Sequence, residues 1–156
     1  MPLSGGGEGA TVVLARRENF NAHGYDVATL YIETREQDES PALFTIVPIF
    51  TSGAERLELA AAGGADCRLN DFRLVHRTGA DAELIIASRP LGSSYADPAA
   101  VKFEYYLLKH NTSRVIGRPD FYFEWQRAVM AKKMYCDVNE AFDVELGLSP
   151  YRPDDP

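Results

Sequence analysis

Short runs of β-branched and aromatic residues, separated by clusters of Gly, Pro, Asp and Ser, make up most of the sequence. Such runs are typical of strands, and such clusters are typical of the turns between them. Strands are predicted at residues 11–17, 25–33, 43–50, 56–60, 67–77, 83–89, 101–110 and 121–135. The segment 27–32 is apolar on both faces, as expected of a central strand, whereas Pro48 indicates an edge strand or a bulge.

One helix is predicted near the C-terminus, at residues 138–146. Asp137 stands at its N-cap position with Glu140 three residues later, and Gly147 follows as a C-terminal stop. Phe142 would face the sheet. The pattern therefore predicts a mainly β fold, a single-domain antiparallel β-sandwich with a short C-terminal α-helix.

The length of 156 residues fits one domain with one hydrophobic core. We predict a single β-rich domain at residues 11–150, preceded by a flexible Gly-rich segment at 1–10 and followed by a loose tail at 151–156. No apolar run approaches the roughly 20 residues that a membrane-spanning helix requires, so no membrane span is expected. The oligomeric state is left open.

Acidic residues outnumber basic ones, 23 to 16, which gives a net charge of −7. This charge repels the phosphates of nucleic acids, so a nucleic-acid partner is not expected. The N-terminus lacks the basic segment followed by an apolar one that marks a signal peptide. An exported protein would have lost its signal from this sequence, whereas a complete native chain would be cytoplasmic.

The chain has two cysteines, Cys67 and Cys136, and neither has another Cys or a His at metal-ligand spacing. Three interpretations remain: a disulfide, two buried thiols, or one reactive thiol. We favour the disulfide, because the number is even and each cysteine lies in a segment predicted to be structured. Such a bridge would indicate an oxidising compartment, and closing a loop of about 70 residues would contribute on the order of 4 kcal/mol.

Motifs for catalysis are missing from the sequence. The three histidines, His23, His76 and His110, form no short metal-binding pair, and the chain contains no Gly-x-Ser-x-Gly or Ser-x-x-Lys motif and no phosphate-binding glycine loop. We therefore predict no catalytic residues, no metal ligands and no cofactor. A hydrolase would need a site assembled from dispersed residues.

The connection between the first two predicted strands, residues 16–26, is unusually polar. The candidate binding residues in this connection are Arg17, Asn19, Asn21, His23 and Asp26. Under the functional interpretation they form a recognition surface presented by a rigid scaffold. Under the structural interpretation the asparagines cap the loop and Arg17 pairs with Asp26. Both interpretations stay open.

A second polar cluster interleaves Arg68, Asn70, Asp71 and Arg73 with apolar residues. Its expected role is Arg–Asp pairing beside the disulfide. Five aromatic residues are expected in the core: Tyr105, Tyr106, Tyr122, Phe123 and Trp125.

Several segments together resemble the CarG-type carbapenem self-resistance family. They are RENFNAHGYD at 17–26, ADC at 65–67, DFRL at 71–74, SYADP at 94–98, YY at 105–106, GRP at 117–119 and YCDVNEAF at 135–142. Members of the family usually begin with a signal peptide and an acidic, Asp-Gly-rich stretch, in place of which this chain has GGGEGA at 5–10.

The resemblance implies a periplasmic, β-rich protein that protects against carbapenems without destroying them. Protection would come from binding, either by sequestering the antibiotic or by shielding its target, so the expected partner is a carbapenem or a protein. The lack of a Ser-x-x-Lys pair agrees with a non-enzymatic protein. The alternatives are an extracytoplasmic protein–protein interaction module unrelated to antibiotics and a hydrolase with a dispersed site.

Overall fold

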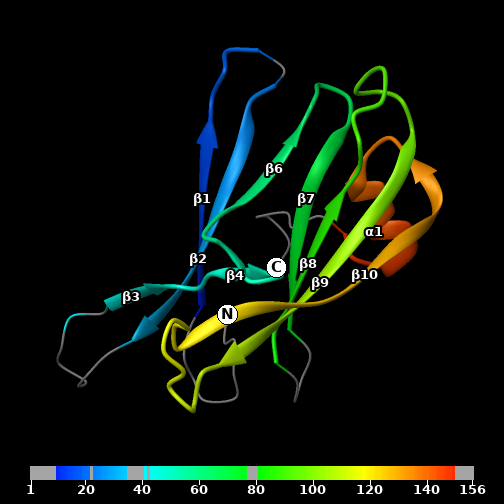
Figure 1. Ribbon diagram of the computed structural model, residues 1–156. Coiled ribbons are helices and arrows are strands. Elements are labelled where there is room, and N and C mark those ends of the chain that lie inside the picture. The colour runs from blue at the N-terminus through cyan, green and yellow to red at the C-terminus, as the bar shows by residue number, and fades with distance from the viewer. Residues whose placement is uncertain (1–9, 22, 35–40, 42, 77–80, 150–156) are drawn as a thin grey trace.

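The computed structural model describes residues 10–21, 23–34, 41, 43–76 and 81–149 (Figure 1). Strands and helix in these residues are β1 Ala10–Arg17, β2 Tyr25–Thr34, β3 Leu43–Ile46, β4 Ile49–Thr51, β5 Ala54–Arg56, β6 Leu59–Gly63, β7 Arg68–Val75, β8 Glu83–Ser88, β9 Ala99–His110, β10 Phe121–Tyr135 and α1 Val138–Leu146. The predicted flexible segment, apart from residue 10, and the predicted tail at 151–156 lie outside the described residues.

Most predicted strands are confirmed, with two differences. The strand predicted at 43–50 is divided into β3 and β4, because Pro48 has no N–H to donate to a ladder. The strand predicted at 56–60 is replaced by β5 and β6. The sequence analysis missed β5, which pairs with β4 across a tight turn in which Ser52 and Gly53 have φ of 49° and 84°.

The strands form one sheet in the order β1-β2-β6-β7-β8-β9-β10-β4-β5, with β3 also paired to β2. Pairing is antiparallel except between β4 and β10. The bent segment β3–β4 joins β2 to β10, since the Val47 N–H donates to the Leu30 carbonyl at 2.8 Å and the Phe123 N–H donates to the Pro48 carbonyl at 2.8 Å. The mainly β fold with a C-terminal helix is confirmed, and the strands form one large mixed sheet in place of the two sheets expected of a sandwich.

Each face of the sheet carries its own apolar core, because successive side chains of a strand point to opposite faces. We call these two clusters the inner core and the outer core. In β8, Leu84 and Ile86 belong to the inner core, and Ile85 and Ala87 belong to the outer core. The inner core contains Ala28, Leu30, Ile32, Val47, Ile49, Leu59, Ala82, Leu84, Ile86, Tyr106, Leu108 and Phe123. The outer core contains Ile85, Ala87, Val101, Phe103, Tyr105, Tyr135, Val138, Ala141 and Phe142.

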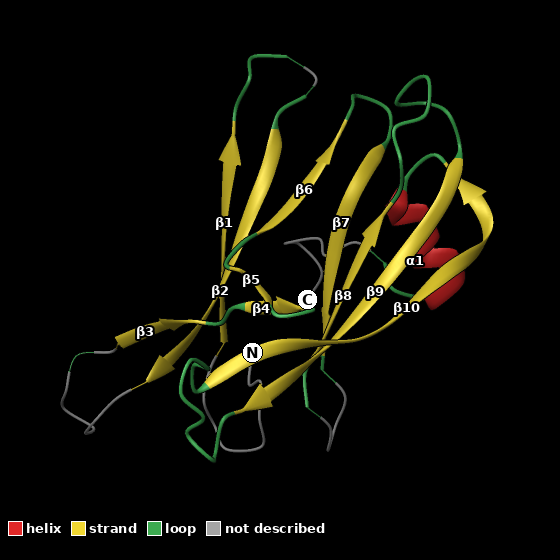
Figure 2. Ribbon diagram, in the orientation of Figure 1, coloured by secondary structure: helices red, strands yellow, loops and turns green. Residues whose placement is uncertain are grey.

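The helix α1 covers the outer core, and Figure 2 shows it beside β9 and β10. Its predicted caps are confirmed: the Asp137 carboxylate accepts the Asn139 N–H at 2.7 Å, and Gly147 ends the helix in a left-handed conformation. Phe142 is fully buried, with its ring centroid 5.4 Å from that of Phe103. None of the helices among the described residues is long and apolar enough to cross a membrane.

Helix α1 is also tied to β10 by Tyr135. The Tyr135 hydroxyl donates to the Glu145 carboxylate at 2.8 Å, and the same carboxylate oxygen accepts the Lys132 N–H at 3.1 Å. Burial, together with the bond to Glu145, raises the pKa of Tyr135 to about 12. At its other end the Asp137 carboxylate accepts the Arg68 N–H at 3.1 Å, so the helix is held to the sheet at both of its ends.

Candidate binding site

Three connections meet at one end of the sheet, which we call the disulfide end. They are the β1–β2 loop at residues 18–24, the β6–β7 loop at 64–67 and the β8–β9 loop at 89–98, all at the top of Figure 1. The His23 and Tyr95 rings lie 4.8 Å apart between centroids, which places the first loop against the third. This arrangement brings part of the predicted binding loop close to the cysteines.

The predicted disulfide between Cys67 and Cys136 is confirmed, with the two Cα atoms 5.7 Å apart. Buried Arg89 reinforces it by donating to the carbonyls of Cys136, Pro90 and Tyr95. These bonds satisfy most of the guanidinium, as a buried charge requires, and they tie the backbone at Cys136 to the β8–β9 loop.

The glycine at position 64 allows the second and third loops to approach each other. A Cβ atom added to Gly64 would lie 2.8 Å from the Tyr95 ring, closer than real Cβ contacts. The Tyr95 carbonyl also lies 3.8 Å from the Cys136 sulfur. Tyr95 therefore links the β1–β2 loop, the β6–β7 loop and the disulfide.

Beneath the loops, arginines and aspartates alternate in an ion-pair network. The Asp26 carboxylate contacts Arg16 at 3.1 Å and Arg68 at 3.5 Å. The largely buried side chains of Arg73 and Asp71 pair at 3.5 Å, and Arg68 contacts the same carboxylate at 3.9 Å. The Arg–Asp pairing predicted beside the disulfide is thus confirmed.

The sheet register decides which arginine of β1 reaches Asp26. Arg16 stands directly opposite Asp26 in the antiparallel ladder, and Arg17 stands opposite Tyr25. Residues directly opposite each other share a face, while sequence neighbours point to opposite faces. The Arg17–Asp26 pair of the structural interpretation is therefore wrong, and Arg16 takes that place.

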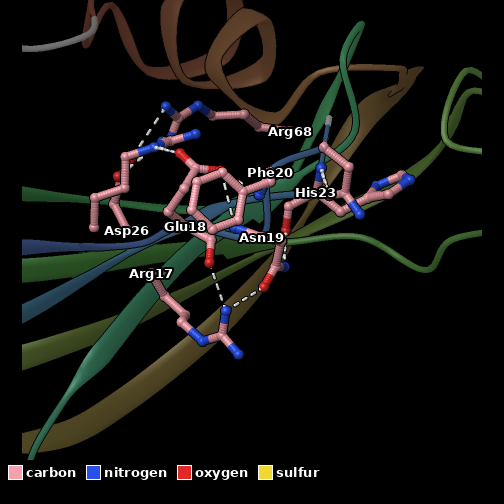
Figure 3. Close-up of polar contacts among 9 residues, drawn as sticks. Arg17, Glu18, Asn19, Phe20, His23, Asp26 and Arg68 are labelled. Carbon is pink, nitrogen blue, oxygen red and sulfur yellow. Dashed lines mark hydrogen bonds and ion pairs between the residues drawn. The ribbon is translucent and has the colours of Figure 1, made fainter.

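The β1–β2 loop is organised around the carboxylate of Glu18 (Figure 3). One of its oxygens accepts the backbone N–H groups of Asn19 at 2.9 Å and Phe20 at 2.8 Å, and the other contacts Arg16 at 3.3 Å. The bond from the Phe20 N–H, followed by those from Arg16 and Asn19, lowers the pKa of Glu18. This carboxylate holds Phe20 in the left-handed region, with a φ of 56°.

The predicted binding residues of this loop mostly bond to the loop itself. The Asn19 side chain accepts a hydrogen bond from Arg17 at 2.5 Å and donates one to the His23 carbonyl at 2.8 Å. The Asn21 side chain accepts the His23 N–H at 2.8 Å. These asparagines cap the loop as the structural interpretation expects, and a role of the five residues in binding stays a prediction.

Phe20 is a residue of this loop that the sequence analysis did not select. Its exposed fraction is 96%, although it is a large apolar residue within an otherwise polar connection. The signal in the sequence was the lone aromatic residue among polar ones. A lone aromatic residue, however, is more often buried, so the sequence alone did not predict its exposure.

The other residues considered for catalysis do not gather. The His110 ring stacks on Phe121 at 4.4 Å, at the end of the sheet opposite His23. Within residues 10–149, apart from the undescribed gaps, no group of three or more His, Cys, Asp or Glu residues could hold a metal ion. Trp125, expected in the core, is exposed beside an irregularity in the β9–β10 pairing.

The comparison with solved structures gives a clear likeness of fold. The chain is similar to a protein described as "Crystal structure of CarG", with a TM-score of 0.71 and 20% sequence identity over 90% of this chain and 85% of that one. No curated protein sequence matches. Residues 1–144 match the family described as "Carbapenem resistance protein CarG-like". Because the match covers most of the 156 residues, the chain belongs to the CarG-like family of carbapenem resistance proteins.

Proposed function

We propose that this protein protects bacteria against carbapenems by binding, without hydrolysing the antibiotic. The family and the fold support a role in carbapenem resistance. The single observation that supports a binding role is the pre-organised β1–β2 loop, whose shape is fixed by Glu18 and Asn19. A surface that is ordered before it meets its partner loses less entropy on association.

The sequence itself argues against hydrolysis of the antibiotic. Serine β-lactamases use a Ser-x-x-Lys pair, and this chain contains none. At the disulfide end the Asp26 carboxylate is already paired with both Arg16 and Arg68.

The proposed place of action is outside the cytoplasm, in the periplasm. The Cys67–Cys136 disulfide supports this, because disulfides persist in oxidising compartments and are rare in the cytosol. The bridge also holds the loops that we propose to be functional. Protection should therefore depend on export.

The test is expression in a carbapenem-susceptible bacterium, with an added export signal and, as the control, without one. We expect the exported protein to raise the inhibitory concentration of a carbapenem while the drug disappears from the medium no faster than with an empty vector. Accelerated loss of the drug would establish hydrolysis and contradict the proposal. Unchanged susceptibility with confirmed periplasmic protein would contradict it as well.

A second candidate function is docking to a protein partner unrelated to antibiotics. The edge strand β1 favours it, because Val12, Val13 and Leu14 are exposed there and an unpaired strand edge can receive another strand. An exported protein that binds an envelope protein but leaves carbapenem susceptibility unchanged would support this function.

A further inference from the structure

We infer that Phe20 is the anchor through which this protein docks onto another protein, and that this partner is the cell-wall transpeptidase whose serine a carbapenem acylates. The inference rests on the proposed function and selects shielding of the target over capture of the drug. It assigns the polar residues of the β1–β2 loop to positioning and assigns contact to Phe20 and Arg17.

The first step is the exposure of Phe20. At 96% it is almost wholly in water, whereas the fully buried phenylalanines Phe123 and Phe142 show what this side chain does when the fold can cover it. Removing such apolar surface from water is favourable, and single aromatic residues carry much of the free energy of many interfaces. A partner that covers Phe20 would gain this contribution.

The second step is the way the loop holds Phe20. Its φ of 56° is uncommon for a bulky residue, and such a conformation persists only where the surroundings enforce it. Here the Glu18 carboxylate enforces it through the N–H groups of Asn19 and Phe20. The anchor is therefore oriented before the partner arrives, which lowers the entropy lost on docking.

The third step is the neighbouring guanidinium of Arg17. One of its nitrogens, Nη1, donates to the Glu18 carbonyl and to the Asn19 side chain. Among the described residues Arg17 has no carboxylate partner, whereas Arg16 next to it has two. Its remaining N–H groups can meet a carboxylate of the partner, and Arg is among the residue types enriched at the energetic centres of protein interfaces.

The fourth step is shape. Sites for small molecules are concave and bury most of the ligand, whereas Phe20 is a fully exposed side chain on a loop and lines no wall. An exposed anchor fits a socket on another protein, with an acidic group placed for Arg17. In a protein that protects against carbapenems, the partner with a direct effect is the drug's target, whose nucleophilic serine the docked protein would shield from acylation.

The experiment measures how fast a fluorescent β-lactam labels purified cell-wall transpeptidases of the protected bacterium, with and without this protein. The variants are Phe20→Ala, Arg17→Gln and, as a matched control, Ile116→Ala, which removes an apolar side chain of 99% exposure in the β9–β10 loop. The thermal midpoint of each variant is measured to confirm folding. We expect the wild type and Ile116→Ala to slow labelling, and Phe20→Ala to need at least about tenfold more protein for the same effect. Arg17→Gln should weaken the effect less.

Two results would overturn the inference. If the wild type leaves the labelling rate unchanged, the transpeptidase is not the partner. If Phe20→Ala slows labelling as well as the wild type does, Phe20 is not the anchor. A protein that protects bacteria, binds the carbapenem in calorimetry and leaves labelling unchanged would retain the proposed function and refute docking. A protein that fails to protect bacteria would refute the proposed function itself.

Discussion

Two loops at opposite ends of the sheet present the most exposed of the large apolar side chains among the described residues, Phe20 in the β1–β2 loop and Ile116 in the β9–β10 loop. Both loops are fixed by a side chain that bonds to their backbone. In the β9–β10 loop, at residues 111–120, this is the buried amide of Asn111, which donates to the carbonyls of Val115 and Arg118 and accepts the Val115 N–H. In the β1–β2 loop it is the exposed carboxylate of Glu18.

The difference between the two loops lies in what surrounds the exposed residue. Ile116 lies between two arginines of its loop, Arg114, which is exposed, and Arg118, which is stacked on the Phe50 ring at 4.1 Å. Phe20 follows an arginine that has no acidic partner within the described chain. Exposure of an apolar residue alone therefore does not identify a binding surface, and the variants below compare the two loops directly.

The largest expected difference between the two ends of the sheet comes from removing the disulfide. Replacing both Cys67 and Cys136 by alanine should lower the free energy of unfolding by about 4 kcal/mol, because the bridge closes a loop that spans a sequence separation of 69. Denaturant unfolding measures this loss. Hydrogen exchange should accelerate in residues 89–98 and remain unchanged in 111–120 under native conditions. Equal acceleration at both ends would remove the distinction.

Packing of helix α1 on the outer core should stabilise the disulfide end of the sheet. Phe142→Ala should cost about 3 kcal/mol, because it removes a fully buried ring and leaves a cavity. Val144→Ala, on the exposed side of the same helix, is the matched control and should change the unfolding free energy by less than about 0.5 kcal/mol. Similar costs for both variants would mean that the helix is not packed as described.

The two loop-fixing asparagines should differ in energy although their roles are alike. Asn111→Ala should cost about 2 kcal/mol, since it leaves partly buried backbone groups without partners. Asn19→Ala should cost less than about 1 kcal/mol, because water replaces its partners in an exposed loop. Chemical denaturation of the two single variants checks this order, and the reverse order would contradict it.

Acid should loosen the β1–β2 loop but not the β9–β10 loop. Because the folded state lowers the pKa of Glu18 below 4.5, the stability from this carboxylate is present above pH 4.5 and is lost as the pH falls through the folded pKa. The loop at 111–120, held by an amide that does not titrate, should not respond. NMR titration of the Phe20 and Val115 amide protons measures both responses. A Phe20 shift that persists in Glu18→Gln would assign the effect to another group.

Local patterns in the sequence were sufficient for much of this structure. Alternation and turn residues predicted most strands, and Asp137 and Gly147 predicted both ends of the helix. The even cysteine number predicted the bridge between Cys67 and Cys136. Each of these predictions depends on neighbours in the sequence or on a chemical pairing with one solution.

Non-local geometry could not be predicted in the same way. The link between β2 and β10 depends on the bend at Val47 and Pro48, which pairs one segment with these two distant strands. The choice of Arg16 over Arg17 as the partner of Asp26 follows from the strand register, which a one-residue shift would reverse. The exposure of Phe20 follows from the hydrogen bond between its N–H and the Glu18 carboxylate, and no recognised sequence pattern predicts this bond.

The most direct test of this account is the carbapenem susceptibility of bacteria that export the wild type, Phe20→Ala or Ile116→Ala to the same periplasmic level. The account predicts that Ile116→Ala protects as well as the wild type, whereas Phe20→Ala leaves bacteria nearly as susceptible as an empty vector does. Full protection by Phe20→Ala, with the folded protein confirmed in the periplasm, would contradict it.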